Sequence, residues 1–446
     1  MTELKLTDHL FGEVGEVPIV DACPKLTHFT CDPSKIIPFG DNDELTQITY
    51  LSMENTYFYK DRVERILKRC PNLQCFNSKA ALGLAARVAA RHFVDLDLIL
   101  TWCPKLTSFG TTSDLYRTDT DPTLYIRNKP GLCYFQTVDR YGVDKIVRCL
   151  KNNRSTLEYL YLRQNETDHD WYSLLKTVDL PSLRTFSLHI KVDAQSLVAL
   201  MNHFHTVQKW FFSRRNNPII FDTSIIQSLH TSNTVAHLHL EQVTFNDDLC
   251  LSLLLDRLPA LQTLNLFQCK IPSQVPESFQ CPQQLKNLRL HEIKWKHNVR
   301  HKAEKELAVA QFMKGFIHSQ STLEDLHLRN IPKIGKHLLL TIGMMRTLKY
   351  LELDVSSMHL RDQDIVGFFK MLQKTEIVEL TICNVIPQCG SGYKEVTAEP
   401  LYNNPSNGIQ LFEGTDMKSS YWKKQNDTRQ KVYRRASDLR RYVADE

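Results

Sequence analysis

The segment Thr167-Asp-His-Asp170 brings two carboxylates beside a histidine, which are residue types that can do general acid–base chemistry. It directly precedes the apolar run that begins at Trp171. A polar side chain immediately before such a run more often caps a helix, because its oxygen accepts a hydrogen bond from the first turn. We therefore expect a helix start here and not a catalytic group.

Other patterns that carry chemistry are missing from the sequence. It has no glycine-rich phosphate loop, no His-Glu-x-x-His zinc helix and no Gly-x-Ser-x-Gly nucleophile turn. The 17 histidines do not pair at metal-binding spacing. We expect a protein that is not an enzyme, with no metal and no cofactor.

Residues suited to binding are more frequent than residues suited to catalysis. Lys209 beside Phe211, and Arg289 near His327, could hold a carboxylate or a phosphate group. Aromatic and arginine side chains dominate binding hot spots because they bury much surface and also form hydrogen bonds. Whether these residues share one surface depends on the elements that position them.

An internal repeat provides those elements. Segments such as Ser155-Thr-Leu-Glu-Tyr-Leu-Tyr-Leu162 and Ser321-Thr-Leu-Glu-Asp-Leu-His-Leu328 share the pattern Leu-x-x-Leu-x-Leu. Most copies are spaced by 24 to 29 residues, which is typical of leucine-rich repeats. The first apolar position of each copy falls at Leu26, Leu45, Leu73, Leu106, Leu132, Leu157, Leu183, Val207, Val235, Leu261, Leu285, Leu323, Leu348 and Ile377.

The fold follows from the two periodicities within each repeat. In x-Leu-x-Leu the leucines point to one face of a strand, and the residues between them face solvent. Amphipathic helices return the chain to the next strand at Tyr59–Lys68, Tyr141–Leu150, Asp193–His203, Asp247–Leu258, Ala303–His318 and Asp362–Gln373. The sequence predicts an α/β leucine-rich-repeat solenoid (horseshoe) of about fourteen repeats, with a parallel sheet on the concave face and helices on the convex face.

A cysteine followed by proline precedes several repeats, as at Cys23, Cys70 and Cys103. The resulting Cys-Pro-x-Leu-x-x-Leu/Phe pattern resembles the irregular, cysteine-containing leucine-rich repeats of F-box substrate adaptors over residues 20–387. No F-box is recognisable. The resemblance implies repeats that hold a substrate protein, and Skp1 and a cullin as partners where an F-box exists.

Composition and local breaks in the repeat set the domain boundaries. We expect a cap or partial repeat over 1–22, the solenoid over 23–387 and a disordered basic tail over 388–446. Ala80–Leu100 is expected to be a long convex helix, and Lys294–Lys302 a basic loop. The net charge is only +5, the twelve cysteines are scattered, and no apolar run or leader sequence is evident. We expect a cytoplasmic or nuclear protein.

Strand alternation then picks out the residues that should face a partner. We expect the concave contacts at Tyr159, Tyr161, Arg163, Lys209, Phe211, His237, His239, Arg289, His291, His327, Arg329 and Tyr350. Their basic character favours an acidic or phosphorylated protein partner. Three functions remain open: substrate recognition in a ubiquitin ligase of the F-box type, a stand-alone interaction scaffold, and a nucleic-acid-associated protein that uses the basic tail.

Overall fold

The computed structural model describes residues 1–6, 19–31, 43–54, 60–80, 95–113, 121–138, 142–163, 170–213, 218–272, 282–296, 312–316, 322–329, 331, 336–343, 345–354, 379–383, 409–415 and 429–435. The chain forms two compact units. Unit 1 comprises residues 1–192 and 203–208, and unit 2 comprises residues 193–202 and 209–446.

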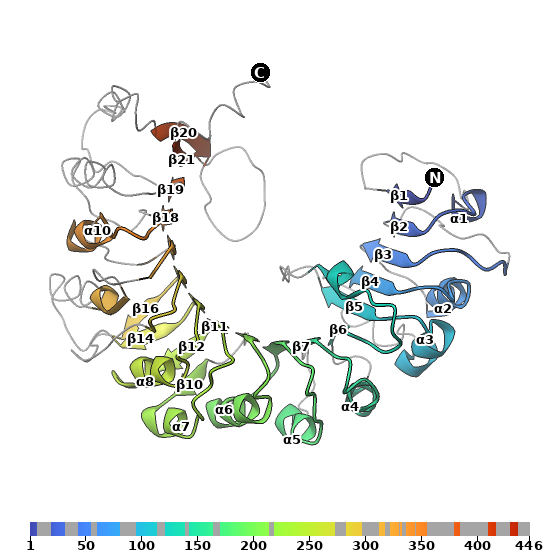
Figure 1. Ribbon diagram of the computed structural model, residues 1–446, viewed down its shortest axis with the longest axis horizontal. Coiled ribbons are helices and arrows are strands. Elements are labelled where there is room, and N and C mark those ends of the chain that lie inside the picture. Colours follow the sequence, from blue (N-terminus) through green and yellow to red (C-terminus); the bar gives the residue numbers. More distant parts are fainter. Residues whose placement is uncertain are drawn as a thin grey trace. The chain divides into compact units, whose positions relative to one another are not determined.

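Unit 1 is a parallel sheet whose strands follow one another in chain order (Figure 1). Short α-helices join them on one side of the sheet, whereas the 3-10 helix lies on the other side. The strands are β1 (Glu3–Lys5), β2 (His28–Cys31), β3 (Tyr50–Glu54), β4 (Cys75–Ala80), β5 (Ser108–Ser113), β6 (Tyr134–Val138), β7 (Tyr159–Arg163) and β8 (Thr185–His189). The helices are α1 (Ile19–Ala22), α2 (Lys60–Lys68), α3 (Leu96–Trp102), the 3-10 helix η3 (Pro122–Tyr125), α4 (Val143–Asn152) and α5 (Trp171–Leu175).

Unit 2 repeats this arrangement and adds a second small sheet. Its main parallel strands are β9 (Lys209–Phe212), β11 (His237–Glu241), β13 (Thr263–Phe267), β15 (Asn287–His291), β17 (Asp325–Arg329), β18 (Tyr350–Asp354) and β19 (Glu379–Cys383). The second sheet consists of β10 (Ile219–Phe221), β12 (Val243–Phe245), β14 (Lys270–Pro272) and β16 (Lys294–Lys296). Its helices are α7 (Thr223–Gln227), α8 (Cys250–Asp256) and α10 (Lys336–Gly343), while α6 (Ala194–His203) lies at the division between the units.

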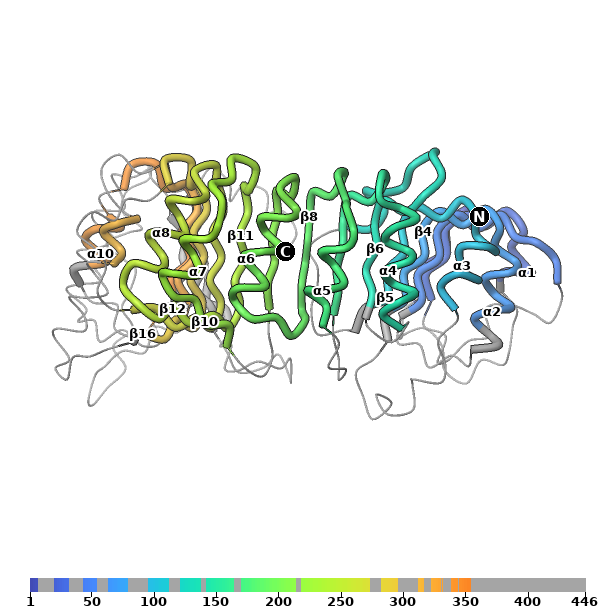
Figure 2. Tube along the Cα trace, turned by 90° about the horizontal axis from the view of Figure 1, so that it is seen from below, coloured from blue at the N-terminus to red at the C-terminus, as the bar shows by residue number. Residues whose placement is uncertain are grey.

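The register confirms the predicted leucine-rich-repeat fold. Leu160 pairs with Phe135 and Phe186, and Leu264 pairs with Leu238 and Leu288, so each inward position meets its counterpart in the next repeat. These side chains are buried, and each repeat therefore covers the apolar face of its neighbours. Seen after a quarter turn, consecutive described repeats advance step by step within each unit (Figure 2).

The predicted second repeat is displaced by three residues. Leu45 is 68% exposed, whereas Ile48 is fully buried and Leu51 pairs with Phe29 of β2. The first apolar position is therefore Ile48, which lies 22 residues after Leu26 and 25 before Leu73. Leu45-x-x-Ile48 satisfied the first two positions of the pattern, so the sequence alone did not separate the two alignments.

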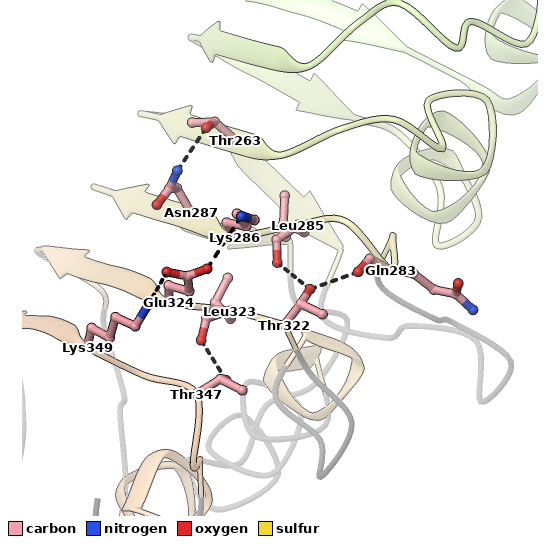
Figure 3. Close-up of polar contacts among 10 residues, drawn as sticks. All are labelled: Thr263, Gln283, Leu285, Lys286, Asn287, Thr322, Leu323, Glu324, Thr347 and Lys349. Atoms are coloured by element: carbon pink, nitrogen blue, oxygen red, sulfur yellow. Dashed lines mark hydrogen bonds and ion pairs between the residues drawn. The ribbon is translucent and has the colours of Figure 1, made fainter. Parts of the chain in front are cut away.

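Hydroxyl groups just before the first apolar position link neighbouring repeats. In unit 1 the Thr156 hydroxyl donates to the Leu132 carbonyl at 2.9 Å. In unit 2 Thr322 donates to the carbonyl of Leu285 at 2.9 Å, and Thr347 donates to that of Leu323 at 2.8 Å (Figure 3). Each bond satisfies a carbonyl at the strand entrance, which fixes the start of one repeat on the preceding one.

Two of the cysteines at repeat boundaries, Cys70 and Cys103, are buried thiols. Burial raises the pKa of Cys70 to about 11 and that of Cys103 to about 12. Both lie inside unit 1, where they pack as small apolar side chains.

Other differences from the sequence prediction lie in unit 2. Lys294–Lys296 is strand β16, not the start of a loop. Within the range predicted to be a disordered tail, β20 (Ile409–Thr415) pairs antiparallel with β21 (Arg429–Arg435), and β21 pairs antiparallel with β19. The boundary at residue 388 stays a prediction. Residues 81–94, 297–302, most of Ala303–His318 and all of Asp362–Gln373 lie outside the described residues.

None of the described helices has the length and apolar character needed to cross a membrane.

Candidate functional site

The concave face is here the sheet face turned away from the helices in each unit. On β9, β11, β13, β15, β17 and β18 it carries the residues that alternate with the buried leucines. Parallel pairing aligns Phe211, His239, Asn265, Arg289, His327 and Glu352 in one row across unit 2. The backbone register therefore brings together residues that are far apart in the sequence.

Aromatic and histidine rings occupy the first part of this face. The rings of Phe211 and His239 lie 5.8 Å apart, and those of Phe267 and His291 lie 6.0 Å apart in an edge contact. Burial lowers the pKa of His237, and the neighbouring Lys209 lowers it further. His237 is therefore a neutral ring at neutral pH, and these rings offer partly apolar surface.

A charged network occupies the second part of the concave face of unit 2. Arg289 approaches Asp325 at 3.6 Å, and Arg329 forms an ion pair with Glu352. His327 lies between the two acids, with Nε2 2.5 Å from Asp325 Oδ1 and Nδ1 2.5 Å from Glu352 Oε2. These groups come from three adjacent strands, β15, β17 and β18.

The carboxylates beside both nitrogens of His327 favour the protonated ring. Both ring nitrogens face carboxylate oxygens, which only accept hydrogen bonds, and a neutral imidazole can donate only one. Burial favours the neutral form, but the bonds to Asp325 and Glu352 outweigh it and raise the pKa of His327. Burial likewise opposes the ionised form of Glu352, yet bonds from His327 and Arg329 lower its pKa.

His291 lies opposite Arg329 on the neighbouring strand, and its pKa shifts in the opposite direction to that of His327. Burial, together with the positive charges of Arg329, His327 and Arg289, lowers the pKa of His291 to about 4. Its Nε2 is buried without a hydrogen-bond partner among the described residues. His291 is therefore neutral, and its environment is electrically positive.

Part of the concave face of unit 1, around Tyr134 and Tyr159, is covered by its own chain. Asp121 caps η3 by accepting a hydrogen bond from the Thr123 amide at 2.9 Å. The Tyr125 ring then lies 5.3 Å from that of Tyr134 and 5.7 Å from that of Tyr159, which are stacked on each other at 4.4 Å. Residues 121–127 thus form a strap over the strands, and we call them the strap.

Polar contacts fix the far end of the strap. Arg127 forms an ion pair with Glu158 at 3.3 Å, and its backbone amide donates to the Thr107 hydroxyl at 3.2 Å. Tyr125 also has a side-chain hydrogen bond with Thr185 of β8. The strap therefore contacts successive strands of unit 1.

Three of the residues expected to face a partner are consequently not accessible. Tyr159, Tyr161 and Arg163 are buried, with exposed fractions of 2 to 4%. The alternation placed their backbone correctly, but the sequence pattern did not show that Tyr125 of the strap packs on the tyrosine cluster that includes Tyr159 and Tyr161. The other expected residues, namely Lys209, Phe211, His237, His239, Arg289, His291, His327, Arg329 and Tyr350, all lie in unit 2 and are partly or fully exposed.

Sequence reasoning omitted two members of the charged network, Asp325 and Glu352, from the set of partner contacts. Both stand at outward positions of the repeat, so the same alternation includes them. Their role depends on side-chain contacts across strands, which the sequence alone does not reveal.

The acid–histidine segment is a helix cap at its described end. The Ser173 amide donates to Asp170 Oδ1 at 3.0 Å, and hydrogen bonds with Ser173 lower the pKa of Asp170. Thr167–His169 lie outside the described residues. Among the described residues, no three His, Cys, Asp or Glu side chains are arranged to hold a metal ion.

Comparison with known proteins leaves the family open. No family model and no curated protein matches the chain. One similar solved structure, the crystal structure of a TLR13–ssRNA13 complex, shares 14% sequence identity at a TM-score of 0.36. The match covers 81% of this chain and 47% of that chain, so the protein spans less than half of the matched chain's length.

Proposed function

We propose that the protein is a binding scaffold that holds a partner protein on the concave face of unit 2. The observation that carries this proposal is the exposed mixture of aromatic, histidine and arginine side chains on that face. Tyr350 is 46% exposed, and Phe211 and Phe267 are partly exposed among polar neighbours. Partly exposed aromatic rings surrounded by charged groups are typical of protein contacts.

The charges of the same face favour an acidic or phosphorylated partner, as the sequence predicts. Arg289 and Lys209 are exposed on it. Two carboxylates lie among the cations, so the partner must match a mixed pattern and not a uniform positive field.

The proposed scaffold can be tested by comparative affinity capture with the full chain. A double variant Phe211→Ser/Phe267→Ser removes two rings from the concave face. The matched control is Ile220→Ser/Leu249→Ser, which removes apolar side chains that are 53% and 51% exposed elsewhere in unit 2. We expect proteins captured by the wild type and the control to be lost with the concave variant, as quantified by mass spectrometry. Identical captured sets for all three chains would reject the concave face as the binding surface.

The finer proposal of substrate recognition in a ubiquitin ligase rests on the resemblance of the Cys-Pro repeats to those of F-box adaptors. The same capture experiment tests it independently of the concave face. Skp1 and a cullin should remain bound to both variants, because in F-box adaptors that attachment does not use the repeats. Their absence from all captures would remove the ligase role and leave the scaffold.

A further inference from the structure

Three cationic side chains form what we call the basic cluster: Arg289 on β15, and His327 and Arg329 on β17. Strand pairing places His327 directly opposite Arg289 and Arg329 opposite His291. The cluster therefore occupies a fixed position on a rigid sheet, which is favourable for a binding site.

The charge of this network does not balance. With His327 protonated between the two carboxylates, the basic cluster carries three positive charges. Asp325 and Glu352 supply two negative charges in contact with it. One positive charge remains, which an anionic group from outside can neutralise.

The neighbouring His291 lies within reach of the same charges. Besides burial, three cations act on its ring and lower its pKa, against a single opposing carboxylate, Glu352. A local potential of this sign attracts a negatively charged ligand.

The arginines retain donors that can reach such a ligand. The Arg289 side chain is 44% exposed, and its contact with Asp325 at 3.6 Å is longer than a hydrogen bond. The Arg329 side chain is 41% exposed, while its Nε and one terminal nitrogen are directed at Glu352. Glu352 thus orients one guanidinium group, and both arginines present further N–H groups to solvent.

The surroundings of the basic cluster distinguish a polypeptide from a nucleic acid. Tyr350 pairs in register with Asp325, and Phe267 contacts His291, so aromatic surface borders the cluster. A phosphodiester backbone carries charge at every nucleotide and would meet both carboxylates of the network. A polypeptide can place one acidic side chain on the arginines and apolar side chains on the rings.

We propose that the basic cluster receives a carboxylate from an acidic, aromatic-containing segment of the partner protein. This inference rests on the proposed scaffold function and adds the chemistry of the partner. Arg289 and Arg329 donate to the carboxylate, His327 supplies charge, and Asp325 and Glu352 hold these groups in place.

The test measures binding of fluorescein-labelled peptides to the full chain by fluorescence anisotropy. The probe is a short peptide of repeating Glu-Gly-Glu-Tyr, compared with its Gln-Gly-Gln-Tyr counterpart. We expect clear preference for the glutamate peptide. Arg289→Ala and Arg329→Ala should each weaken its binding by about three- to tenfold. Lys270→Ala, which removes an exposed positive charge from the second sheet, should leave binding unchanged.

A variant that should strengthen peptide binding distinguishes the loss of a contact from misfolding, because misfolding would only weaken binding. Glu352→Gln removes one competing negative charge while retaining an acceptor for Arg329. We expect it to bind the glutamate peptide more tightly than the wild type.

Equal binding of the glutamate and glutamine peptides, or no effect of either arginine variant, would overturn the proposal. Stronger binding of a phosphoserine peptide or an oligothymidylate than of the glutamate peptide would also overturn the carboxylate assignment. These results are distinct from failure of the scaffold, because proteins lost on Phe211→Ser/Phe267→Ser would still identify the concave face as a binding surface.

Discussion

The two units bury the same type of inward-facing apolar strand residues, but their concave faces differ. In unit 1 Tyr125 of the strap packs on Tyr134 and Tyr159 and covers the outward tyrosines of β6 and β7. In unit 2 the equivalent strand positions carry Phe211, Arg289 and Tyr350, which are partly or fully exposed. The repeat pattern is the same in both units. The accessibility of the face therefore depends on what the connections between strands do, and not on the strands alone.

The largest effects should arise where the two units are equivalent. Leu160→Ala in unit 1 and Leu264→Ala in unit 2 each leave a cavity at a fully buried position. We expect each to lower the free energy of unfolding by about 2–5 kcal/mol, as measured by urea denaturation. A marked difference between the two losses of unfolding free energy would show that the buried strand positions of the two units are not equivalent.

Removal of the strap ring should expose the covered part of the concave face of unit 1, around Tyr134 and Tyr159. Tyr125→Ala removes two aromatic contacts, each worth about 0.5–1.5 kcal/mol, so we expect stability to fall by roughly 1–3 kcal/mol. Tyr159 should also become reactive towards tetranitromethane, as detected by mass spectrometry. Leu124→Ala, at an exposed position of η3, is the control and should change neither quantity. Unaltered nitration of Tyr159 in Tyr125→Ala would mean that the strap is not what protects it.

The charged network of unit 2 should make its stability depend on pH in a way that unit 1 does not share. The groups facing His327 are Arg289 and His291 from β15, Asp325 and Arg329 from β17, and Glu352 from β18.

Because the folded pKa of His327 is raised, its contribution to stability is present below the unfolded value of about 6.5 and is lost as pH rises through the folded pKa. The depressed pKa of Glu352 acts at the other end, where stability is lost as pH falls through it. We expect His327→Gln to abolish the loss above neutral pH, as seen in urea unfolding across a pH series. An unchanged pH profile in the variant would exclude His327 as its source.

The smallest effect concerns the turns that follow the concave strands. Gln242, Gln268 and Glu292 have φ values of 57°, 53° and 53°, whereas the described residues of unit 1 with positive φ are glycines. The side-chain amide of Gln242 donates from Nε2 to Oε1 of Gln268 at 3.0 Å, and the side-chain amide of Gln268 donates from Nε2 to Oε2 of Glu292 at 2.7 Å. Gln268→Ala loses both bonds and keeps the left-handed backbone.

Gln268→Gly loses the same bonds but relieves a backbone cost of about 1 kcal/mol. We expect alanine to be the more destabilising substitution by about this amount, as judged by thermal unfolding. The reverse order would indicate that the side-chain ladder alone controls these turns.

The sequence predicted the inward apolar strand positions well, because each repeat must bury residues at the same fixed spacing. Of the thirteen first apolar positions that the structure describes, twelve keep their predicted alignment with the strands, while Leu45 was displaced to Ile48; Ile377 lies outside the described residues. The displaced copy arose where two apolar residues three positions apart satisfied the pattern equally.

The strap was not predicted for a different reason. Leu106 and Leu132 lie 26 residues apart, an ordinary repeat spacing, so the gap gave no sign of an unusual connection. Asp121-Pro and Pro130-Gly131 disfavour a helix there, but they do not indicate that Tyr125 turns onto Tyr159. The charged network was likewise only half predicted, because its ion pairs link side chains from three repeats.

The buried thiols have a practical consequence for probing these surfaces. Alkylating reagents and maleimide dyes attack the thiolate, and the raised pKa values of Cys70, Cys75, Cys103, Cys149, Cys250 and Cys269 keep that form scarce at neutral pH. In the natively folded protein we expect these six cysteines to remain unlabelled by maleimide dyes. A cysteine introduced at Tyr350 could then carry a fluorophore or a photo-crosslinker to the concave face while these six cysteines are kept, once the partly exposed Cys23 and the cysteines whose burial is not described are replaced.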